Sequence, residues 1–389
     1  MPSAPDPTVA GNTPETRPEN RAFYPALDGL RAIAFLLVFF QHYPVGRFGI
    51  PWGWTGVQFF FVLSGFLITG ILYDTRNHPH RVRNFYLRRT LRIFPLYYGV
   101  MLFILLLYPF AHWRIDWRWL AWPAYLGNYL RFISPSAMIV GTPWQSLADF
   151  QPANHHIALF LGHFWSLCVE EQFYLFWPAV VFLIRDRRKL LWLCALTVPL
   201  GLAARLTGQH LFAPWLLQQE ILYRATPFCL DSLLLGGLLA LLLRGPIAPH
   251  LLRFARYLTP IVFLVGAWWI HLVLLRNYIY PTWMFTWGLT FVNLLAALVI
   301  LIAVQRETFL YRALSLSPLR WIGRISYGAY VLHDIPHLIY RATAQTFYHS
   351  HPTRTTALLA LPCTLLLAWL SYRFFESPFL RLKDRWTIP

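Results

Sequence analysis

The chain has 389 residues, of which 57% are hydrophobic and 13% are charged, and its mean hydropathy is +0.46. These values exclude an ordinary soluble globular protein. The formal net charge of +17 would favour a nucleic-acid partner in a soluble protein, but here the arginines cluster between apolar runs, as the positive-inside rule predicts for cytoplasmic loops. The sequence therefore predicts a multi-pass protein of the cell membrane that contacts the lipid bilayer and binds no nucleic acid.

The basic clusters determine the predicted topology. If all of them face the cytoplasm, the fold class is all-α, with about ten transmembrane helices and both termini in the cytoplasm. The spans are predicted at 27–43, 57–73, 93–111, 164–184, 190–204, 225–243, 257–275, 283–304, 326–347 and 355–375. Residues 112–163 then lie on the outer side, where tryptophans such as Trp119 and Trp122 suit the headgroup interface and the stretch 118–132 lies flat or re-enters. If that stretch crosses instead, a second crossing is needed before His163.

Both ends of the chain are predicted to be short tails. Residues 1–22 lack the basic region and apolar core of a signal peptide, so we expect a disordered cytoplasmic tail there. Residues 23–380 form a single transmembrane domain, and 381–389 form a short cytoplasmic tail. The four cysteines have no metal-ligand spacing, so we expect free thiols and no metal site.

The first predicted span carries an arginine and a histidine on one face. Arg31 and His42 are separated by about three helical turns, or roughly 16 Å along the axis. Ionisable groups inside a span are costly and usually face a cavity where they have a function. His42 is the natural general base, since an imidazole titrates near working pH, although a histidine hydrogen-bonded to a neighbouring helix is an equally ordinary interpretation.

The next two spans contribute a small pair and a basic pair. Ser64 and Gly65 lie among aromatic residues, where they let another helix backbone come close. Arg89 and Arg92 share one helical face at the start of the third span, and two neighbouring guanidinium groups can clamp a phosphate. The alternative is that both arginines are topology signals that meet lipid headgroups.

The fourth span begins with two carboxylates, and the ninth carries a polar stripe. Glu170 and Glu171 lie about a turn and a half inside the fourth span, and a structural ion pair with Arg31 is the alternative to a catalytic role. In the ninth span, Ser326, Tyr330 and His333 lie on one stripe at i, i+4 and i+7. That stripe lines a polar groove or makes structural hydrogen bonds between helices.

These segments in this order resemble the acyltransferase-3 family of integral membrane acyltransferases, which includes bacterial O-antigen O-acetyltransferases. The resemblance covers nearly the whole folded chain. The family shares an Arg followed ten residues later by a His, and an Arg-x-x-Arg motif. The matching segments are Arg31 with His42, Arg89 with Arg92, Phe60–Leu67, Trp165–Tyr174, Ser326–His333 and Glu376–Pro378.

The resemblance implies transfer of an acyl group, commonly acetyl, from an acyl-CoA donor to a hydroxyl of a carbohydrate, a lipid-linked glycan or another envelope molecule. We expect His42, Arg31, Glu170 and Glu171 to be catalytic, with His42 acting as base or transient acyl carrier. The donor, which is a substrate and not a resident cofactor, is expected at Arg89, Arg92 and Ser64. The acceptor is expected in a groove formed by Ser326, Tyr330, His333 and Trp165. The competing class is a transporter or flippase for a lipid-linked sugar or small molecule, in which the same groups relay protons.

Overall fold

The computed structural model describes residues 24–43, 52–111, 117–133, 139–140, 159–211, 221–275, 282–335 and 354–387. The described chain is helical apart from a two-stranded antiparallel pair, β1 (Ile139–Val140) and β2 (Leu159–Phe160), in which Ile139 pairs with Phe160. The all-α prediction is therefore confirmed for these residues. The predicted tail at 1–22 and the second half of the predicted span 326–347 lie outside the described residues.

The N-terminal half contains the first six α-helices. They are α1 (Pro25–His42), α2 (Thr55–Asp74), α3 (Arg81–Ala111), α4 (Gly127–Ile133), α5 (Trp165–Leu183) and α6 (Arg187–Leu211), with 3-10 turns η2 (Trp117–Ala121) and η4 (Gly162–Phe164). The C-terminal half contains α8 (Thr226–Leu242), α9 (Ala248–Leu275), η5 (Thr282–Phe285), α10 (Trp287–Ala303), α11 (Phe309–Leu314), α12 (Ser317–Leu332), α14 (Arg354–Leu370), the π-helical segment η6 (Ser371–Glu376) and α15 (Ser377–Trp386).

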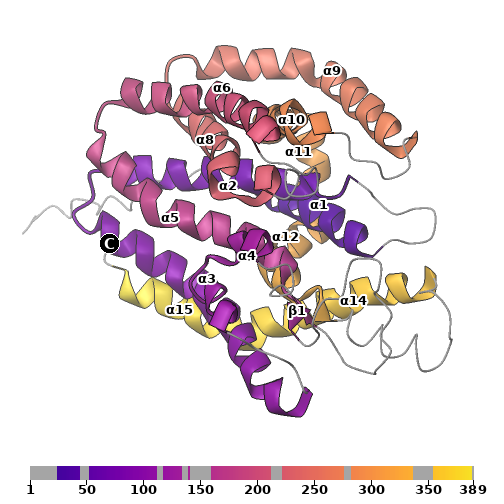
Figure 1. The fold of residues 1–389 in the computed structure, drawn as a ribbon. Coiled ribbons are helices and arrows are strands. Elements are labelled where there is room, and N and C mark those ends of the chain that lie inside the picture. Colours follow the sequence, from indigo (N-terminus) through magenta and orange to yellow (C-terminus); the bar gives the residue numbers. More distant parts are fainter. Residues whose placement is uncertain are drawn as a thin grey trace, which may run out of the picture.

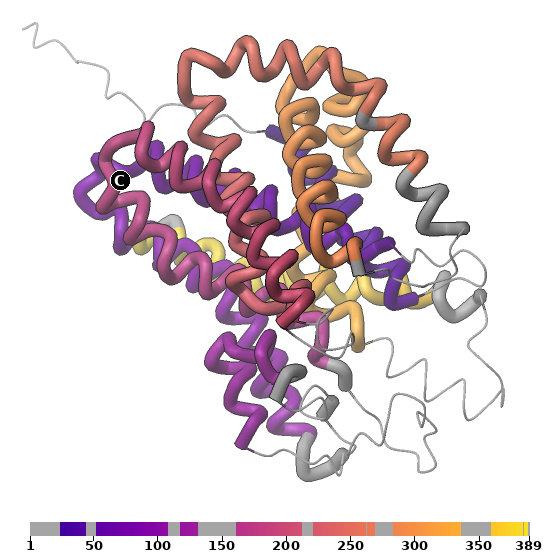
Figure 2. The backbone as a smooth tube through the Cα atoms, turned by 45° about the horizontal axis from the view of Figure 1, so that its top comes forward, coloured from indigo at the N-terminus to yellow at the C-terminus, as the bar shows by residue number. Residues whose placement is uncertain are grey.

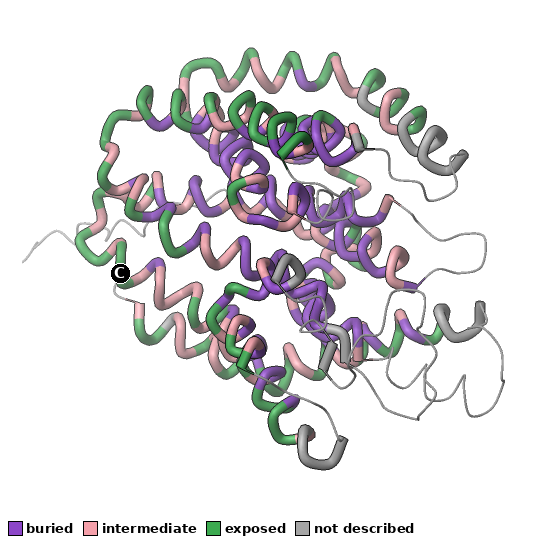
Figure 3. Tube along the Cα trace, viewed as in Figure 1, coloured by how far each residue is buried: buried purple, intermediate pink, exposed green. Residues whose placement is uncertain are grey.

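The helices pack as a bundle with α2 near its centre. Helix α2 packs against α8, α1, α10 and α5, whereas α9 lies along the outside of the bundle against α10 (Figures 1 and 2). The buried residues gather in the middle of the bundle, and the exposed ones lie on its outer helices (Figure 3). Many exposed side chains of those outer helices are large and apolar, for example Leu106, Leu200 and Leu264. Such a surface fits lipid, not water.

Glycines set the closest helix contacts. A Cβ atom at Gly65 of α2 would overlap the carbonyl oxygen of Leu233 in α8, and one at Gly236 of α8 would overlap that of Val62 in α2. The prediction that Gly65 lets another backbone come close is confirmed. Only a glycine fits where two helix backbones approach this closely.

Five helices in the described part of the chain are long and apolar enough to cross a membrane. They are 55–74, 81–107, 162–183, 187–211 and 221–242, and α10 is a shorter apolar helix. The protein is therefore a multi-pass membrane protein. Five of the predicted spans coincide with these helices, although α3 begins at Arg81, twelve residues before the predicted start, because the helix continues through its basic, amphipathic first turns.

The segment expected at the headgroup interface differs from the prediction. Trp119 and Trp122 are buried, Trp122 completely, whereas Trp117 is 77% exposed. The Trp122 ring does not face lipid, because it packs against Phe164, the residue directly before α5. The Trp122 carbonyl accepts a hydrogen bond from the Tyr97 hydroxyl of α3. The described residues between 117 and 133 therefore cap the bundle, with the short helix α4 packed on α5.

Candidate active site

A cavity of about 100 Å³, open in part to the outside, lies between α1, α2, α3, α5 and α12. Its lining includes most of the polar residues that the sequence singles out. They are Arg31, Ser64, Arg89, Arg92, Glu170, Glu171, Ser326 and Tyr330, and the hydroxyls of Ser166, Tyr174 and Tyr327 join them in the lining. The structure thus brings together groups from five helices that are far apart in the sequence. Three guanidinium groups and two carboxylates face this one space.

Arg89 lies beside an aromatic ring of α5. Its guanidinium carbon is 5.1 Å from the centroid of the Tyr174 ring, and the Tyr174 hydroxyl is hydrogen-bonded to the Ser64 hydroxyl of α2. A cation over an aromatic face is stabilised by the ring quadrupole. Tyr174 therefore joins α2 to α3 at the cavity and holds the Arg89 side chain toward it.

Arg31 is paired within its own helix. Its Nη1 is 3.1 Å from Oδ1 of Asp28, one turn earlier, and its side chain is 27% exposed. The predicted alternative, a direct ion pair between Arg31 and Glu170 or Glu171, is therefore not found among the described residues, where Arg31 pairs with Asp28 instead. Arg31 lies within electrostatic range of Arg89 and Arg92, and Asp28, Glu170 and Glu171 are the carboxylates close enough to offset the repulsion among these three cations.

The carboxylates of Glu170 and Glu171 both lie within electrostatic range of Arg89. Oε1 of Glu171 is buried and has no hydrogen-bond partner among the described residues. A buried oxygen without a partner calls for an explanation, and a ligand donor in the cavity supplies one.

A histidine cluster lies beyond the cavity lining, where α1, α5 and α12 meet. Nδ1 of His42 is 2.9 Å from Nε2 of His333, and the two rings stack with their centroids 5.0 Å apart. The His163 ring packs edge-on against His333 at 4.4 Å. His333 and His163 are buried. His42 and His333, which the sequence analysis places in separate roles, are thus in direct contact.

Tyr330 connects the cavity to this cluster. Its hydroxyl lines the cavity side, where it bonds to Ser166 Oγ at 2.6 Å and donates to the His163 carbonyl at 2.9 Å. Its own carbonyl lies 2.7 Å from Nδ1 of His333. Tyr330 therefore contacts the cavity and the His163 backbone with its side chain, and the His333 ring with its backbone carbonyl.

Three predicted site residues, His42, His333 and Trp165, do not line the cavity. His42 is the last residue of α1, in agreement with the predicted span 27–43, and Tyr43 caps the helix there. Trp165 is buried between Phe61 and Tyr223, with ring centroids 5.8 and 4.7 Å away, and packs the helix ends beneath the cluster. Ser326 lines the cavity, but its hydroxyl donates to the Gly323 carbonyl within its own helix.

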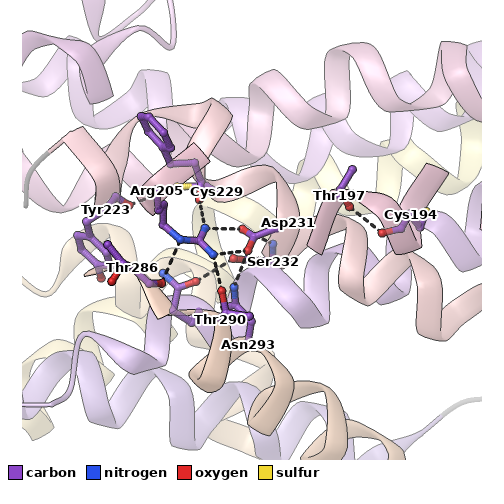
Figure 4. Close-up of polar contacts among 12 residues, drawn as sticks. Cys194, Thr197, Arg205, Tyr223, Cys229, Asp231, Ser232, Thr286, Thr290 and Asn293 are labelled. Carbon is purple, nitrogen blue, oxygen red and sulfur yellow. Dashed lines mark hydrogen bonds and ion pairs between the residues drawn. The ribbon is translucent and has the colours of Figure 1, made fainter. Parts of the chain in front are cut away.

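Two buried polar features, His163 and an ion pair, were not predicted from the sequence. His163 precedes an apolar helix, and only its spatial proximity to His333 marks it. The second is a buried ion pair in which Arg205 of α6 contacts both carboxylate oxygens of Asp231 in α8 at 3.0 and 2.7 Å (Figure 4). Thr290 Oγ1 and the carbonyls of Phe228 and Thr286 accept the remaining guanidinium hydrogens. Since all five donors are used, this pair joins α6, α8 and α10 structurally; a charge inside each of two apolar segments was the available signal.

Among the residues that the structure describes, no group of three or more His, Cys, Asp or Glu side chains is arranged to hold a metal ion. Cys168, Cys194 and Cys229 are buried free thiols, and Cys363 is an exposed one.

A family model described as an acyltransferase domain, of acyltransferase family 3, matches residues 24–373. The chain belongs to this family. It is 29% identical over 92% of its length to the peptidoglycan O-acetyltransferase OatA of Listeria monocytogenes, and 28% identical over 92% to the putative peptidoglycan O-acetyltransferase YrhL of Bacillus subtilis. A putative O-acetyltransferase of Staphylococcus aureus is 26% identical over 94% of the chain.

The chain spans 55–58% of the length of these curated relatives. No solved structure matches it. The family membership confirms the resemblance inferred from the six sequence blocks, and the acyltransferase match includes every residue of the cavity and the histidine cluster.

Proposed function

We propose that this acyltransferase-3 chain is a membrane O-acyltransferase that moves an acyl group, acetyl in its simplest form, from an acyl-CoA donor to a hydroxyl of an envelope carbohydrate or lipid-linked glycan. One observation carries the proposal. An arginine-lined cavity and the His42–His333 pair lie on the two sides of Tyr330, whose side chain lines the cavity and whose carbonyl contacts His333. The relatives named as peptidoglycan O-acetyltransferases support an envelope polymer as acceptor.

The arginine end suits the donor. Arg31, Arg89 and Arg92 carry three positive charges, which the phosphates of a CoA molecule would neutralise with charge-assisted hydrogen bonds. Ser64 and Tyr174 add hydroxyls beside them. The cavity extends from these arginines to Ser166 and Tyr330, so a linear acyl arm would reach toward the histidines.

The histidine end suits the transfer. In the proposed reaction the acceptor oxygen attacks the thioester carbonyl while a nitrogen of His42 takes the hydroxyl proton. The carbon–oxygen bond forms, the carbon–sulfur bond breaks, and the proton passes to the departing thiolate. In the second version His42 first takes the acyl group as an acyl-imidazole and then passes it to the acceptor.

The orientation follows from the basic helix ends. We propose that the arginine end faces the cytoplasm of the plasma membrane, that both chain termini lie there, and that about ten helices cross the bilayer. The donor then enters from the cytoplasm and the acceptor from the outside. Contacts among the basic ends of α3, α6 and α8 and their neighbouring helices support this orientation, because they gather these ends on one side of the bundle.

The test uses purified protein in detergent or vesicles with acetyl-CoA carrying a labelled acetyl group. We expect thioester consumption and label on an acceptor glycan or on the protein, both reduced in His42→Ala to a small residual rate. Arg89→Ala should weaken donor affinity by about 10-fold to 100-fold, the value of a lost charge-assisted hydrogen bond. Arg88→Ala is the matched control, because Arg88 faces Thr387 and does not line the cavity.

A transporter or flippase would move its substrate without consuming thioester. If folded, wild-type protein leaves acetyl-CoA intact in the presence of an envelope glycan fraction, the enzyme proposal is wrong and the transporter alternative gains support. If His42→Ala transfers acetyl groups at the wild-type rate, the central role of His42 is wrong.

A further inference from the structure

We infer that His333 is a positioning residue that orients His42 by accepting a hydrogen bond from its Nδ1–H, so that Nε2 of His42 is the reactive nitrogen. This inference rests on the proposed acyl transfer at His42. It assigns separate roles to two histidines that are 291 residues apart in the sequence.

The hydrogen-bond partners determine the tautomers. Nδ1 of His333 lies 2.7 Å from the backbone carbonyl of Tyr330, and a carbonyl oxygen only accepts, so this nitrogen carries the hydrogen. In a neutral imidazole the other nitrogen then holds the lone pair. Nε2 of His333 therefore accepts, and His42 Nδ1, 2.9 Å away, donates. The lone pair of neutral His42 lies on Nε2.

The neutral form of His333 fits its burial. The residue is 1% exposed, and a buried cation costs more than a buried neutral ring unless an anion pairs with it. The contacts around the ring include a backbone carbonyl, the imidazoles of His42 and His163 and the ring of Tyr330, and the carbonyl accepts the hydrogen that a neutral ring carries on Nδ1.

The surroundings hold His333 in place. Its backbone carbonyl accepts a hydrogen bond from the Tyr43 hydroxyl at 2.6 Å, which ties the end of α12 to the end of α1. The Tyr330 carbonyl that receives Nδ1–H is itself held, because the Tyr330 hydroxyl bonds to Ser166 and to the His163 backbone. Three helix ends therefore fix one ring, and that ring fixes His42.

The chemical consequence is the same in both versions of the transfer. As a base, His42 takes the acceptor proton on Nε2, and the resulting positive charge is shared through Nδ1–H with the His333 lone pair. As an acyl carrier, His42 attacks the thioester with Nε2. An orienting acceptor behind a catalytic histidine typically affects the rate by orders of magnitude, because it selects the reactive tautomer. His333 touches no reacting atom in either version.

The experiment compares two amides at position 333. In His333→Gln the side-chain oxygen reaches the position of Nε2 and accepts from His42, whereas the shorter side chain of His333→Asn reaches only the position of Nδ1. We expect His333→Gln to keep kcat within roughly tenfold of wild type and His333→Asn to lose about 100-fold or more, with the donor KM unchanged in both. A packing role would affect both variants alike.

A double variant separates orientation from independent action. On the His42→Ala background, His333→Asn should cause no further loss beyond about twofold, since a residue acting only through His42 is silent without it. Equal rates for the Gln and Asn variants, or an additive loss in the double variant, would overturn the inference. If the Gln and Asn variants fail to fold, a third variant, Tyr43→Phe, tests the same inference. It keeps the ring stack on Phe39 but removes the hydrogen bond to the His333 carbonyl.

Tyr43→Phe should lower kcat severalfold at unchanged donor KM, and a wild-type kcat in this variant would also contradict the inference. Different results would contradict the role of His42 and the role of His333. If His42→Ala is fully active, the proposed function of His42 is wrong. If His42→Ala is inactive but folded His333→Asn is as active as wild type, only the role of His333 is wrong.

Discussion

At the residue scale, Tyr174 makes two contacts that substitution can separate. Its ring lies under Arg89 at 5.1 Å and its hydroxyl bonds to Ser64. Tyr174→Phe keeps the ring and removes the hydroxyl, whereas Tyr174→Leu removes both. We expect the donor KM to stay near wild type in the first variant and to rise roughly fivefold in the second, as the loss of a cation–π contact of about 1 kcal/mol predicts.

The measurement is the initial rate of acetyl transfer at varied acetyl-CoA, with equal amounts of membrane-inserted protein. A Phe variant as impaired as the Leu variant would place the importance of Tyr174 in its hydroxyl instead. The pair of variants therefore tests how Arg89 is held and leaves the role of Arg89 itself untouched.

The sequence identified many site residues because charge inside an apolar segment is conspicuous. Arg31, Glu170 and Glu171 are visible in this way, since each interrupts a run that is otherwise long enough to cross a bilayer. The contact between His42 and His333 was not predictable, because nothing in either segment indicates which distant helix end it meets. His163 is hidden for the same reason.

At the element scale, the contact between α2 and α8 depends on glycine. A methyl group at Gly65 would collide with the Leu233 backbone carbonyl, which cannot rotate away as a side chain would. We expect Gly65→Ala to lower the free energy of unfolding by about 1–3 kcal/mol or more, the usual cost of overpacking. Gly266→Ala in α9 is the control, since no atom lies within 4 Å of its added Cβ.

Thermal unfolding of the detergent-solubilised protein measures the difference. Gly266→Ala should unfold at or slightly above the wild-type temperature, because alanine favours a helix more than glycine does. If Gly65→Ala matches Gly266→Ala, the two helices do not approach as closely as described.

A second element-scale prediction concerns the buried ion pair between α6 and α8. Asp231→Asn leaves the fully buried Arg205 without its counter-charge, which costs about 3–5 kcal/mol of stability. Asp74→Asn breaks the Arg244–Asp74 pair, whose side chains are 30% and 43% exposed, and should cost no more than about 1 kcal/mol. The unfolding midpoints of the two variants should therefore differ clearly, and equal midpoints would contradict the structural role of Arg205.

Helix existence was more predictable than helix extent. Apolar runs identify α2, α5, α6 and α8 because the bilayer demands about 20 such residues. They do not reveal where α3 begins: the shared helical face of Arg89 and Arg92 predicts helix at these two residues, but the start at Arg81 lies well outside the apolar segment. The position of Arg89 well inside the helix, pointing at the cavity, follows from that early start.

At the scale of the whole molecule, the helix ends separate into two groups. Arg244 after α8 pairs with Asp74 at the end of α2, and Arg187 at the start of α6 donates to the Leu241 carbonyl of α8. Arg81 at the start of α3 lies over the ring of Phe182 at the end of α5. These basic ends therefore lie together on one side of the bundle, and the histidine cluster lies at the opposite ends of α1, α5 and α12.

This grouping predicts which connections between helices share one side of the membrane, and cysteines introduced one at a time can test it. In a variant with Cys363→Ser, which removes the exposed thiol, cysteines at His80, Asp186 and Pro246 should all be labelled by a membrane-impermeant maleimide only from the cytoplasmic side. Each of these exposed positions lies in a connection between basic helix ends. A cysteine at Trp117, which follows the far end of α3 and is 77% exposed, should be labelled only from outside.

The physical reason is the positive-inside bias acting on one rigid bundle. Because the three connections are joined by ion pairs and ring contacts, they cannot lie on different sides of the membrane, so the prediction is stronger than three separate assignments. Labelling of any one of the three from the opposite side would contradict the bundle, whereas inversion of all four positions together would keep the bundle and reverse the proposed entry sides of donor and acceptor.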